Sequence, residues 1–493
     1  MMTRRAFLTA CGLTFCAGCV GVGRGRPAPN LVVVFPDQMR AHALGFMGLD
    51  AAHTPRLDAF AAEGRAFTQA VSNYPVCSPF RAILMSGALP WVSGVTGNCV
   101  STERRAGPEL RADLACWSDV LAAAGYDLCY IGKWHLDAPR RPWVPTSNNN
   151  GPQKWNEWCP PSRRHGFNRW YAYGTYDRHL RPMYWETDAP RDGFRYVDQW
   201  GPEHEADKAI AFLRETKGPF ALVVSMNPPH TGYELVPKRY LRRYAGRDAT
   251  TLAKGDYPPA GTPMGKHFRW AMPYYLAAVE GVDEQFGRIL DALEETGHAE
   301  DTVVLFCSDH GCCLGAHGLP AKNNPYEESM RIPCLVRWKG HIAPGRDAGL
   351  VDSFDLAPTL LGLLGQPIPG HMVGRNLAPY LLGEASADLS EPCLYLHLWG
   401  RNRDDEFPTE PVPLAAAPEG LPDGKRGLRS AKRKCVFVYD AQAKRLGAVL
   451  FDLDADPYET RNLAAERPDQ VAEARAALKA RLRAIGDPFA EVL

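Results

Sequence analysis

The sequence predicts an α/β fold in which a largely parallel sheet lies between helices. Short apolar runs alternate along the chain with stretches of helical periodicity, an order typical of parallel sheets covered by helices. The apolar runs are continuous, as expected for strands buried on both faces. With 493 residues, 45% of them hydrophobic, the chain can form one large α/β domain with a smaller appendage.

The strands are predicted from apolar runs at 31–35, 127–131, 220–226, 302–307 and 333–338. A helix is predicted to begin at Thr54-Pro55, because threonine caps helices and proline suits the first helical position. The longest predicted helix covers about 272–296, where apolar residues recur at helical spacing.

The pattern changes near residues 364–382, which divides the chain. We predict a catalytic domain over 29–375 and a smaller α+β subdomain over 376–493. The tail shows short strand patterns at 394–398, 435–439 and 449–453, and a final amphipathic helix near 470–485. A short antiparallel sheet with a terminal helix is the expected arrangement.

Residues 1–28 are predicted to be an export signal. Arg4-Arg5 precede Phe7-Leu8 and an apolar stretch that is too short to span a bilayer. The arginine pair resembles a twin-arginine signal, with an ordinary secretory signal as the alternative. Ala17-Gly18-Cys19 resembles a lipoprotein cleavage site, so a lipid anchor is a second alternative. We expect a periplasmic or extracellular protein without a transmembrane helix in its mature form.

Charge and cysteine content exclude several classes of protein. The 56 basic and 56 acidic residues balance, so no overall field favours nucleic acid or membrane as a partner. Of the 14 cysteines, the eleven beyond the leader show no C-x-x-C spacing, which argues against a zinc ribbon. Disulfide pairing stays open at this point.

Polar side chains follow four of the predicted strands. Asp37-Gln38 come after the first strand, Lys133 and His135 after the second, His230 after the third and Asp309-His310 after the fourth. Because ligands bind outside the carboxyl ends of strands in open parallel sheets, we expect these residues to meet in one crevice.

Part of this set has the chemistry of a cation site. Asp37, Gln38 and Asp309 offer oxygens suited to calcium or magnesium, while His310 leaves room for manganese or zinc. The alternative is that the two aspartates only cap the turns that follow them.

A second cluster is Cys77-Ser78-Pro79-Phe80-Arg81. Pro79 predicts the first position of a helix, so Cys77 lies at its positive end, which favours an anionic nucleophile. Arg81 adds permanent charge nearby. An activated thiol or an inert buried cysteine are the alternatives.

Cys77 to Arg81, followed by Leu84, Ser86 and Gly87, closely resembles the signature of the sulfatases, in which the cysteine of C-x-P-x-R is oxidised to formylglycine. At the position of Phe80 the family more often has serine or alanine, and at the position of Ser86 it more often has threonine. Six further segments resemble the family in the same order: 30–40, 125–135, 229–230, 308–322, 326–333 and 451–463. In the first of these, Gln38 replaces an aspartate found in many relatives.

The resemblance implies an alkaline-phosphatase-like fold and hydrolysis of a sulfuric ester through a formylglycine hydrate. One hydroxyl of the hydrate attacks sulfur, and the other is then deprotonated and expels sulfate. A maturation enzyme that oxidises the cysteine is an implied partner. The implied ligands of one Ca²⁺, with Mg²⁺ or Mn²⁺ as alternatives, are Asp37, Gln38, Cys77 as formylglycine, Asp309 and His310.

The resemblance also implies roles for the remaining site residues. Arg81 would stabilise the formylglycine, and Lys133 would bind both the hydrate and sulfate. His135 would act as the base for sulfate expulsion. His230 and Lys322 would bind sulfate and protonate the leaving oxygen.

An aromatic and arginine-rich stretch at 140–196 interrupts the α/β alternation and predicts subsites for a sulfated saccharide. The alternative is that its aromatic residues form the stretch's own core. Three other functions stay open: a related phosphonate monoester or phosphodiester hydrolase, a non-catalytic glycan-binding protein, and a thiol enzyme using Cys77 directly.

Overall fold

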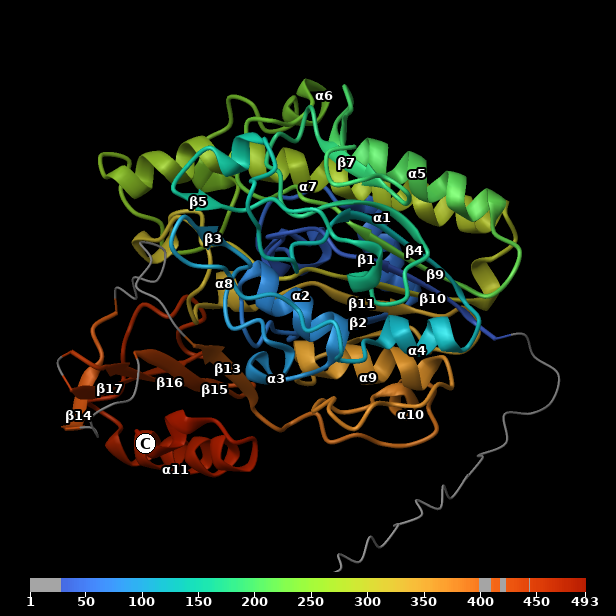
Figure 1. The fold of residues 1–493 in the computed structure, drawn as a ribbon. Helices are drawn as coiled ribbons and strands as arrows, with labels where there is room; N and C mark the ends of the chain where they lie inside the picture. Colours follow the sequence, from blue (N-terminus) through green and yellow to red (C-terminus); the bar gives the residue numbers. More distant parts are fainter. Residues whose placement is uncertain (1–27, 399–408, 417–422, 443) are drawn as a thin grey trace, which may run out of the picture.

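The computed structural model describes residues 28–398, 409–416, 423–442 and 444–493. A ten-stranded sheet lies between two layers of helices, and a smaller sheet packs beside it (Figure 1). This confirms the predicted α/β class. The predicted export signal, including Cys19, falls outside the described residues except for its last position.

The large sheet has the strand order β12-β2-β11-β10-β1-β9-β4-β6-β7-β8. Its five central strands are parallel, and the antiparallel pairs lie toward its edges. The strands are β1 (Asn30–Val34), β2 (Arg65–Phe67), β4 (Asp127–Lys133), β6 (Arg169–Tyr173), β7 (Met183–Glu186), β8 (Arg195–Tyr196), β9 (Phe220–Ser225), β10 (Thr302–Cys307), β11 (Cys334–Arg337) and β12 (Gly345–Asp347). The pair β3 (Ser101–Thr102) and β5 (Gln153–Lys154) stands apart.

Helices cover both faces of this sheet, as Figure 1 shows with α5 and α7 above it and α4 and α9 below. Val32 and Val34 enter one hydrophobic core, whereas Leu31 and Val33 enter the other. The apolar run of β1 is therefore buried on both faces, which is the physical reason for its continuous hydrophobicity. The helices are α1 (Pro55–Glu63), α2 (Cys77–Ser86), α3 (Pro90–Ser93), α4 (Trp117–Ala123), α5 (Gly201–Glu215), α6 (Lys238–Leu241), α7 (Pro263–Glu295), α8 (Glu327–Met330), α9 (Ser353–Leu363), α10 (Ala378–Leu381) and α11 (Pro468–Ala484).

The predicted start of the longest helix was wrong by about nine residues. Helix α7 begins at Pro263, where the Thr262 side chain accepts a hydrogen bond from the Gly265 amide. Pro273 lies inside the helix, at a position where proline usually breaks or kinks a helix. The helix continues through it because the earlier turn buries Phe268 against the core.

The tail forms a five-stranded antiparallel sheet and a terminal helix, α11. Its strands are β13 (Cys393–His397), β14 (Val412–Ala416), β15 (Gly424–Arg429), β16 (Arg433–Asp440) and β17 (Arg445–Asp452). Strands β14 and β15 carry weak apolar patterns and were not predicted. The domain boundary at 375/376 stays a prediction.

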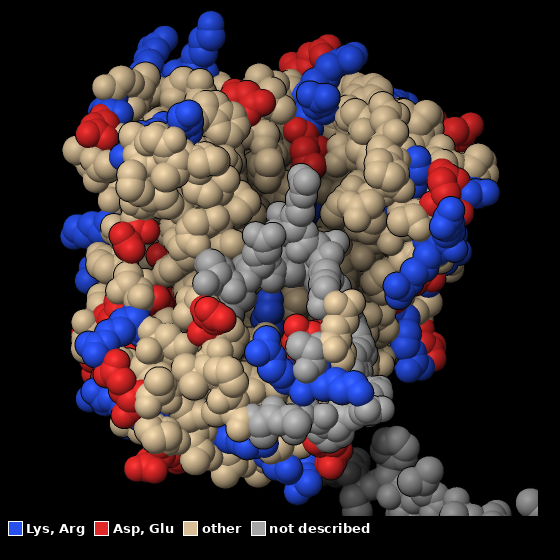
Figure 2. Space-filling view, turned by 90° about the vertical axis from the view of Figure 1, so that its left-hand side faces the viewer, with Lys and Arg blue, Asp and Glu red and all other residues tan. Residues whose placement is uncertain are grey.

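The surface charge of the described residues agrees with the equal numbers of acidic and basic residues in the sequence. Acidic and basic side chains are interspersed over the face in Figure 2. The eleven cysteines beyond the leader are all free thiols and buried. In the described part of the chain, every helix is too short or too polar to cross a bilayer.

Gly132 is the position in β4 where backbone approach is closest, and this gives a stability prediction. Its φ is 98°, and a Cβ there would lie 2.1 Å from the Ser225 carbonyl oxygen. We expect Gly132→Ala to lower the free energy of unfolding by at least about 2 kcal/mol more than Gly125→Ala. Gly125 is the matched control, because its φ is 84° but nothing lies within 4 Å of an added Cβ. Urea denaturation of both variants measures the difference, and equal losses would contradict the prediction.

Candidate active site

Cys77 is the first residue of α2, two residues earlier than the helix start predicted at Pro79. The helix begins earlier because the Val76 carbonyl accepts the first helical hydrogen bond, from the Phe80 amide at 3.0 Å. Pro79 therefore lies within the first turn, where its missing N–H costs nothing. Cys77 remains at the positive end of the helix.

The residues after β1 and β10 meet at this cysteine. The Cys77 Sγ lies 3.7 Å from Asp37 Oδ1 and 3.3 Å from His310 Nε2. Asp37, Cys77, Asp309 and His310 are all buried, and each has a potential ligand atom within 4.8 Å of those of the other three. The structure thus brings together four of the five predicted metal ligands.

The chemistry of this cluster fits a cation. The His310 Nδ1 lies 2.9 Å from the Gly311 carbonyl oxygen, which can only accept, so Nδ1 carries the proton. Burial lowers the pKa of His310 and favours the neutral ring, so Nε2 presents a lone pair. That nitrogen lies 3.6 Å from Asp37 Oδ1 and 3.5 Å from Asp309 Oδ1. Three electron-rich atoms therefore face one another, which is the arrangement that a bound cation stabilises.

Gln38, the fifth predicted ligand, lies beside the cluster in a left-handed backbone conformation. Its amide nitrogen donates to the Tyr233 hydroxyl at 2.9 Å, and its amide oxygen accepts from Lys322 Nζ at 2.7 Å. The side-chain amide is thereby held at both ends, by Tyr233 and by Lys322.

Two buried cations neutralise part of the acidic charge. Arg81 Nη2 lies 3.0 Å from Asp37 Oδ2 and 3.2 Å from Asp309 Oδ2, and Lys133 Nζ lies 2.6 Å from Asp37 Oδ2. Burial acts to raise the pKa of Asp37, but Lys133, His230 and Arg81 hold it well below its usual range. Burial and the neighbouring Asp37 raise the pKa of Asp309 to about 7. Asp309 therefore has less positive charge around it than Asp37, because it shares Arg81 and has no contact with Lys133 among the ion pairs of the described residues.

The cluster opens into a cavity of about 340 Å³. Cys77, Lys133, His135, His230 and Lys322 all line it, so the predicted catalytic residues face one space, apart from Arg81, which lies behind Cys77. Burial and Asp37 act to raise the pKa of the Cys77 thiol, but Lys322, Lys133 and a hydrogen bond with His230 bring it below its ordinary value.

His135 reaches this cavity from the segment after β4, in a left-handed backbone conformation. Both of its ring nitrogens are buried and lack a hydrogen-bond partner among the described residues. Burial, Lys133 and Arg81 hold its pKa well below the usual range, so the ring is neutral. A neutral imidazole on the cavity wall with no partner in the described part of the protein is available to a ligand.

Asp177 is a site residue that the sequence analysis missed. Lys322 Nζ lies 2.8 Å from His230 Nε2, and because an ammonium only donates, Nε2 accepts and Nδ1 carries the proton. Nδ1 then donates to Asp177 Oδ1 at 3.1 Å. The signal for Asp177 was available, since it follows the strand pattern Arg-Trp-Tyr-Ala-Tyr of β6, which was not predicted.

Asn227, just after the end of β9, was missed in the same way. Its side-chain oxygen accepts from Lys133 Nζ at 3.1 Å, and its amide nitrogen donates to Asp177 Oδ1 at 3.0 Å. It links Lys133 to Asp177, two residues that line the cavity, and it directly follows the apolar run that predicted β9.

Most aromatic residues of the 140–196 stretch form hydrophobic cores, which supports the alternative interpretation for them. The buried residues are Phe167, Trp170, Tyr173, Tyr176, Tyr184 and Trp185. Trp155 differs, because it lines the cavity with its ring centroid 6.2 Å from that of His135. Three of the arginines are engaged by acidic partners: Arg140 by Glu109, Arg141 by Glu103 and Arg163 by Asp137.

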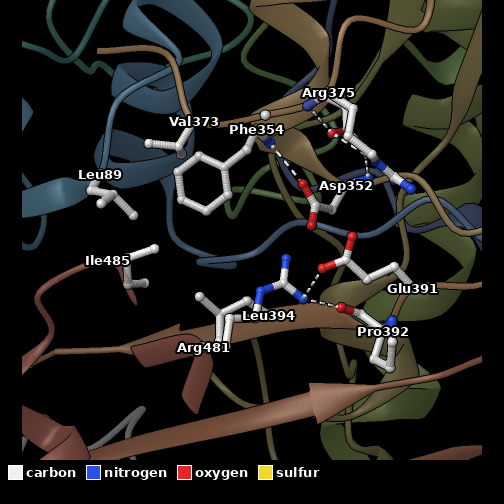
Figure 3. Close-up of a pocket in the computed structure, with 12 residues that line it drawn as sticks. Leu89, Asp352, Phe354, Val373, Arg375, Glu391, Pro392, Leu394, Arg481 and Ile485 are labelled. Atoms are coloured by element: carbon white, nitrogen blue, oxygen red, sulfur yellow. Dashed lines mark hydrogen bonds and ion pairs between the residues drawn. The ribbon is translucent and has the colours of Figure 1, made fainter. Parts of the chain in front are cut away.

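A second cavity, of about 210 Å³, lies between the start of α9, β13 and the end of α11. Figure 3 shows Leu89, Phe354, Val373 and Ile485 grouped on one side of it, with Arg481 beside Glu391 on the other. None of the predicted site residues lines this cavity.

Comparisons with known proteins agree with this fold. A family model described as Sulfatase matches residues 29–366. An endo-4-O-sulfatase of Bacteroides thetaiotaomicron is 37% identical over 90% of each chain. An ulvan-active sulfatase of Formosa agariphila is 29% identical over 94% of this chain and 82% of the relative. The solved structure of a Bacteroides fragilis protein with a sulfatase name superposes with a TM-score of 0.86 at 45% identity, covering 96% of this chain and 99% of that one.

The chain therefore belongs to the sulfatase family and has the alkaline-phosphatase-like fold. It is a sulfuric ester hydrolase, as the sequence resemblance implied.

Asp177→Asn tests the contact that orients His230. Both oxygens of the carboxylate accept hydrogen bonds, whereas the amide keeps one accepting oxygen, places a donor at the other position and has no charge, so the tautomer with an accepting Nε2 is less well supported. We expect kcat/KM for a sulfate ester to fall by about 10–100-fold with the fold retained. Asp198→Asn in the segment before α5 is the control, because Asp198 is exposed and pairs with Arg181 at the surface. A loss shared by both variants, or an unchanged Asp177→Asn enzyme, would contradict the expectation.

Proposed function

We propose that this sulfatase removes sulfate from a sulfated saccharide through a formylglycine formed from Cys77. The observation that carries the proposal is the position of Cys77, at the positive end of α2, beside a candidate cation cluster and facing a cavity lined by Lys133, His135 and Lys322. The relatives named for 4-O-sulfate and for ulvan support a saccharide as the substrate. When formed, the formylglycine hydrate supplies one hydroxyl to attack sulfur and a second to expel sulfate.

The residues of the cavity have separate roles in this proposal. Lys133 and Lys322 bind the sulfate oxygens, because ammonium groups stabilise the charge that develops on them. His230, oriented by Asp177, acts with Lys322 to deliver a proton to the leaving oxygen. His135 is neutral and has no partner among the described residues, so its ring accepts the proton from the second hydroxyl.

We also propose that Asp37, Gln38, Asp309, His310 and the modified Cys77 hold one divalent cation, Ca²⁺ in preference to Mg²⁺ or Mn²⁺. The oxygen-rich ligand set favours a hard ion. A bound divalent cation polarises the sulfate oxygens and lowers the pKa of a coordinated hydroxyl. Arg81 pairs with the Oδ2 atoms of Asp37 and Asp309, so the Oδ1 atoms near His310 are the ones available to the cation.

We also propose that the protein is exported before it acts on its substrate. The leader pattern at 1–28 supports a periplasmic or extracellular location, with a lipid anchor at Cys19 as the alternative. A maturation enzyme would oxidise Cys77 before the chain folds, because the cysteine is buried in the folded protein. A twin-arginine route that exports the folded protein would place this oxidation before transport.

Mass spectrometry of the tryptic peptide 66–81 tests the nucleophile. In protein from a host with sulfatase-maturation activity, we expect a peptide that is lighter than the thiol form and is trapped by a hydrazide. Hydrolysis should resist alkylating agents, and Cys77→Ala should lower kcat by at least about 10³-fold.

The same preparation distinguishes the other functions that the sequence left open. An unmodified thiol and inactivation by alkylation would favour a thiol enzyme. Faster hydrolysis of an aryl phosphonate than of an aryl sulfate would favour the phosphonate hydrolase. Retained glycan binding without turnover would favour a binding protein.

Removal of the cation tests the metal proposal. After chelation, we expect loss of sulfatase activity and a lower Tm, both restored by Ca²⁺ more fully than by Mg²⁺ or Mn²⁺. At a Ca²⁺ concentration of about 100 Kd, binding should add roughly 2.7 kcal/mol to the free energy of unfolding. Asp309→Ala is the control, because it removes a ligand and its Tm should no longer respond to Ca²⁺. A Tm that rises equally in both proteins would overturn the assignment of these ligands.

A further inference from the structure

An exposed aromatic side chain from outside the 140–196 stretch, Trp270, lies next to two residues that line the catalytic cavity. His267, in the first turns of α7, and Tyr233, in the segment after β9, both line the cavity. Trp270 lies three residues beyond His267 and therefore on the same side of α7. It is 46% exposed, whereas Phe268 and Ala271 on the opposite side are fully buried.

Trp270 is in direct continuity with the cavity wall. Its ring centroid lies 5.9 Å from that of Tyr233 and 5.8 Å from that of His267. Tyr233 is itself fixed, because its hydroxyl accepts from the Gln38 amide at 2.9 Å. The exposed indole is thus held one ring away from the residues that face the sulfate, and Tyr274 packs against it at 6.2 Å between centroids.

The surroundings of Trp270 argue for a small, flat, amphipathic ligand. Its helix neighbours Lys266 and Arg269 are polar, and Lys266 is exposed, so the indole is not part of a broad apolar patch that would bind another protein. An indole presents a large rigid apolar face with little conformational entropy to lose. A sugar ring can pack its C–H face on such a surface while its hydroxyl groups remain in water.

We propose that Trp270, supported by Tyr233 and His267, is a stacking platform for the sugar unit that adjoins the sulfated one. The inference rests on the proposed function and deepens it: the substrate class is an oligosaccharide of at least two units. Arg140, Arg141 and Arg163 already pair with acidic side chains, which favours apolar stacking at α7 over these three arginines for recognition of the neighbouring unit.

The test compares two substrates in Trp270→Ala. The first substrate is an oligosaccharide, either one that carries 4-O-sulfate or one from ulvan, whichever the wild-type enzyme hydrolyses faster. On this oligosaccharide we expect kcat/KM to fall by about 3–10-fold, mainly through KM. For a small aryl sulfate, which ends inside the cavity, kcat/KM should change by less than about twofold. Trp270→Phe should recover most of the loss, because it retains a flat ring.

Val373→Ala is the matched control. Val373 is also 46% exposed, but it lines the second cavity shown in Figure 3. This variant should leave both substrates unchanged. Equal losses on both substrates in Trp270→Ala, or no loss on the oligosaccharide, would overturn the platform. A wild-type enzyme that cleaves the aryl sulfate but no oligosaccharide would overturn the saccharide proposal itself.

Discussion

The rest of the site depends on the hydrogen bonds and ion pairs made by the guanidinium of Arg81. One of its nitrogens donates to the carboxylates of both Asp37 and Asp309, and another donates to the Lys133 carbonyl at 2.8 Å and the Ser225 hydroxyl at 2.7 Å. Arg81 projects from α2 one turn after Cys77, so a single side chain ties that helix to the ends of β1, β4, β9 and β10. Its exposure is 1%, and an unpaired charge at that depth would be strongly destabilising. The catalytic geometry and the stability of the sheet edge are therefore coupled.

The same arrangement explains the unequal behaviour of the two aspartates. Asp37 receives both Arg81 and Lys133, and its pKa is held well below the usual range, whereas Asp309 shares Arg81 and has a pKa of about 7. The protein thus neutralises one carboxylate with its own side chains and leaves the other short of positive charge, beside the lone pair of His310. The proposed cation would complete this balance, which connects the electrostatics of burial with the chemistry of a sulfate-binding site.

The cavity combines charge at its base with aromatic surface at its rim. Lys133, His230 and Lys322 are held by Asn227, Asp177 and Gln38, so the groups that would meet sulfate are oriented in advance of ligand binding. Trp155 and Tyr233 line the same space. In the proposed function, this division would separate the recognition of a sulfate group from the recognition of the sugar that carries it.

Much of this could be predicted from the sequence, because the signals are local. The continuous apolar runs predicted β1, β9 and β10 to within about one residue, since strands buried on both faces exclude polar residues. The polar residues that directly follow those strands were predicted to converge, because parallel strands bring their carboxyl ends to one edge. The order of the motifs along the chain was by itself sufficient to indicate the sulfatase family.

Other features depend on packing between distant segments, and only the tertiary structure decided them. Helix α7 extends past Pro273 because Phe268 is buried in the core, so the turn that carries His267 and Trp270 could not be recognised as helical from local propensity. The aromatic residues at 140–196 were equally suited to a core or a ligand, and the fold buried half of them while exposing Trp270 elsewhere. Asp177 became a partner of His230 only because β6 joins the sheet beside β4. The sequence determined which chemical groups lie at the strand ends, whereas the side chains that orient them and form the cavity rim come from segments whose proximity only the packed fold creates.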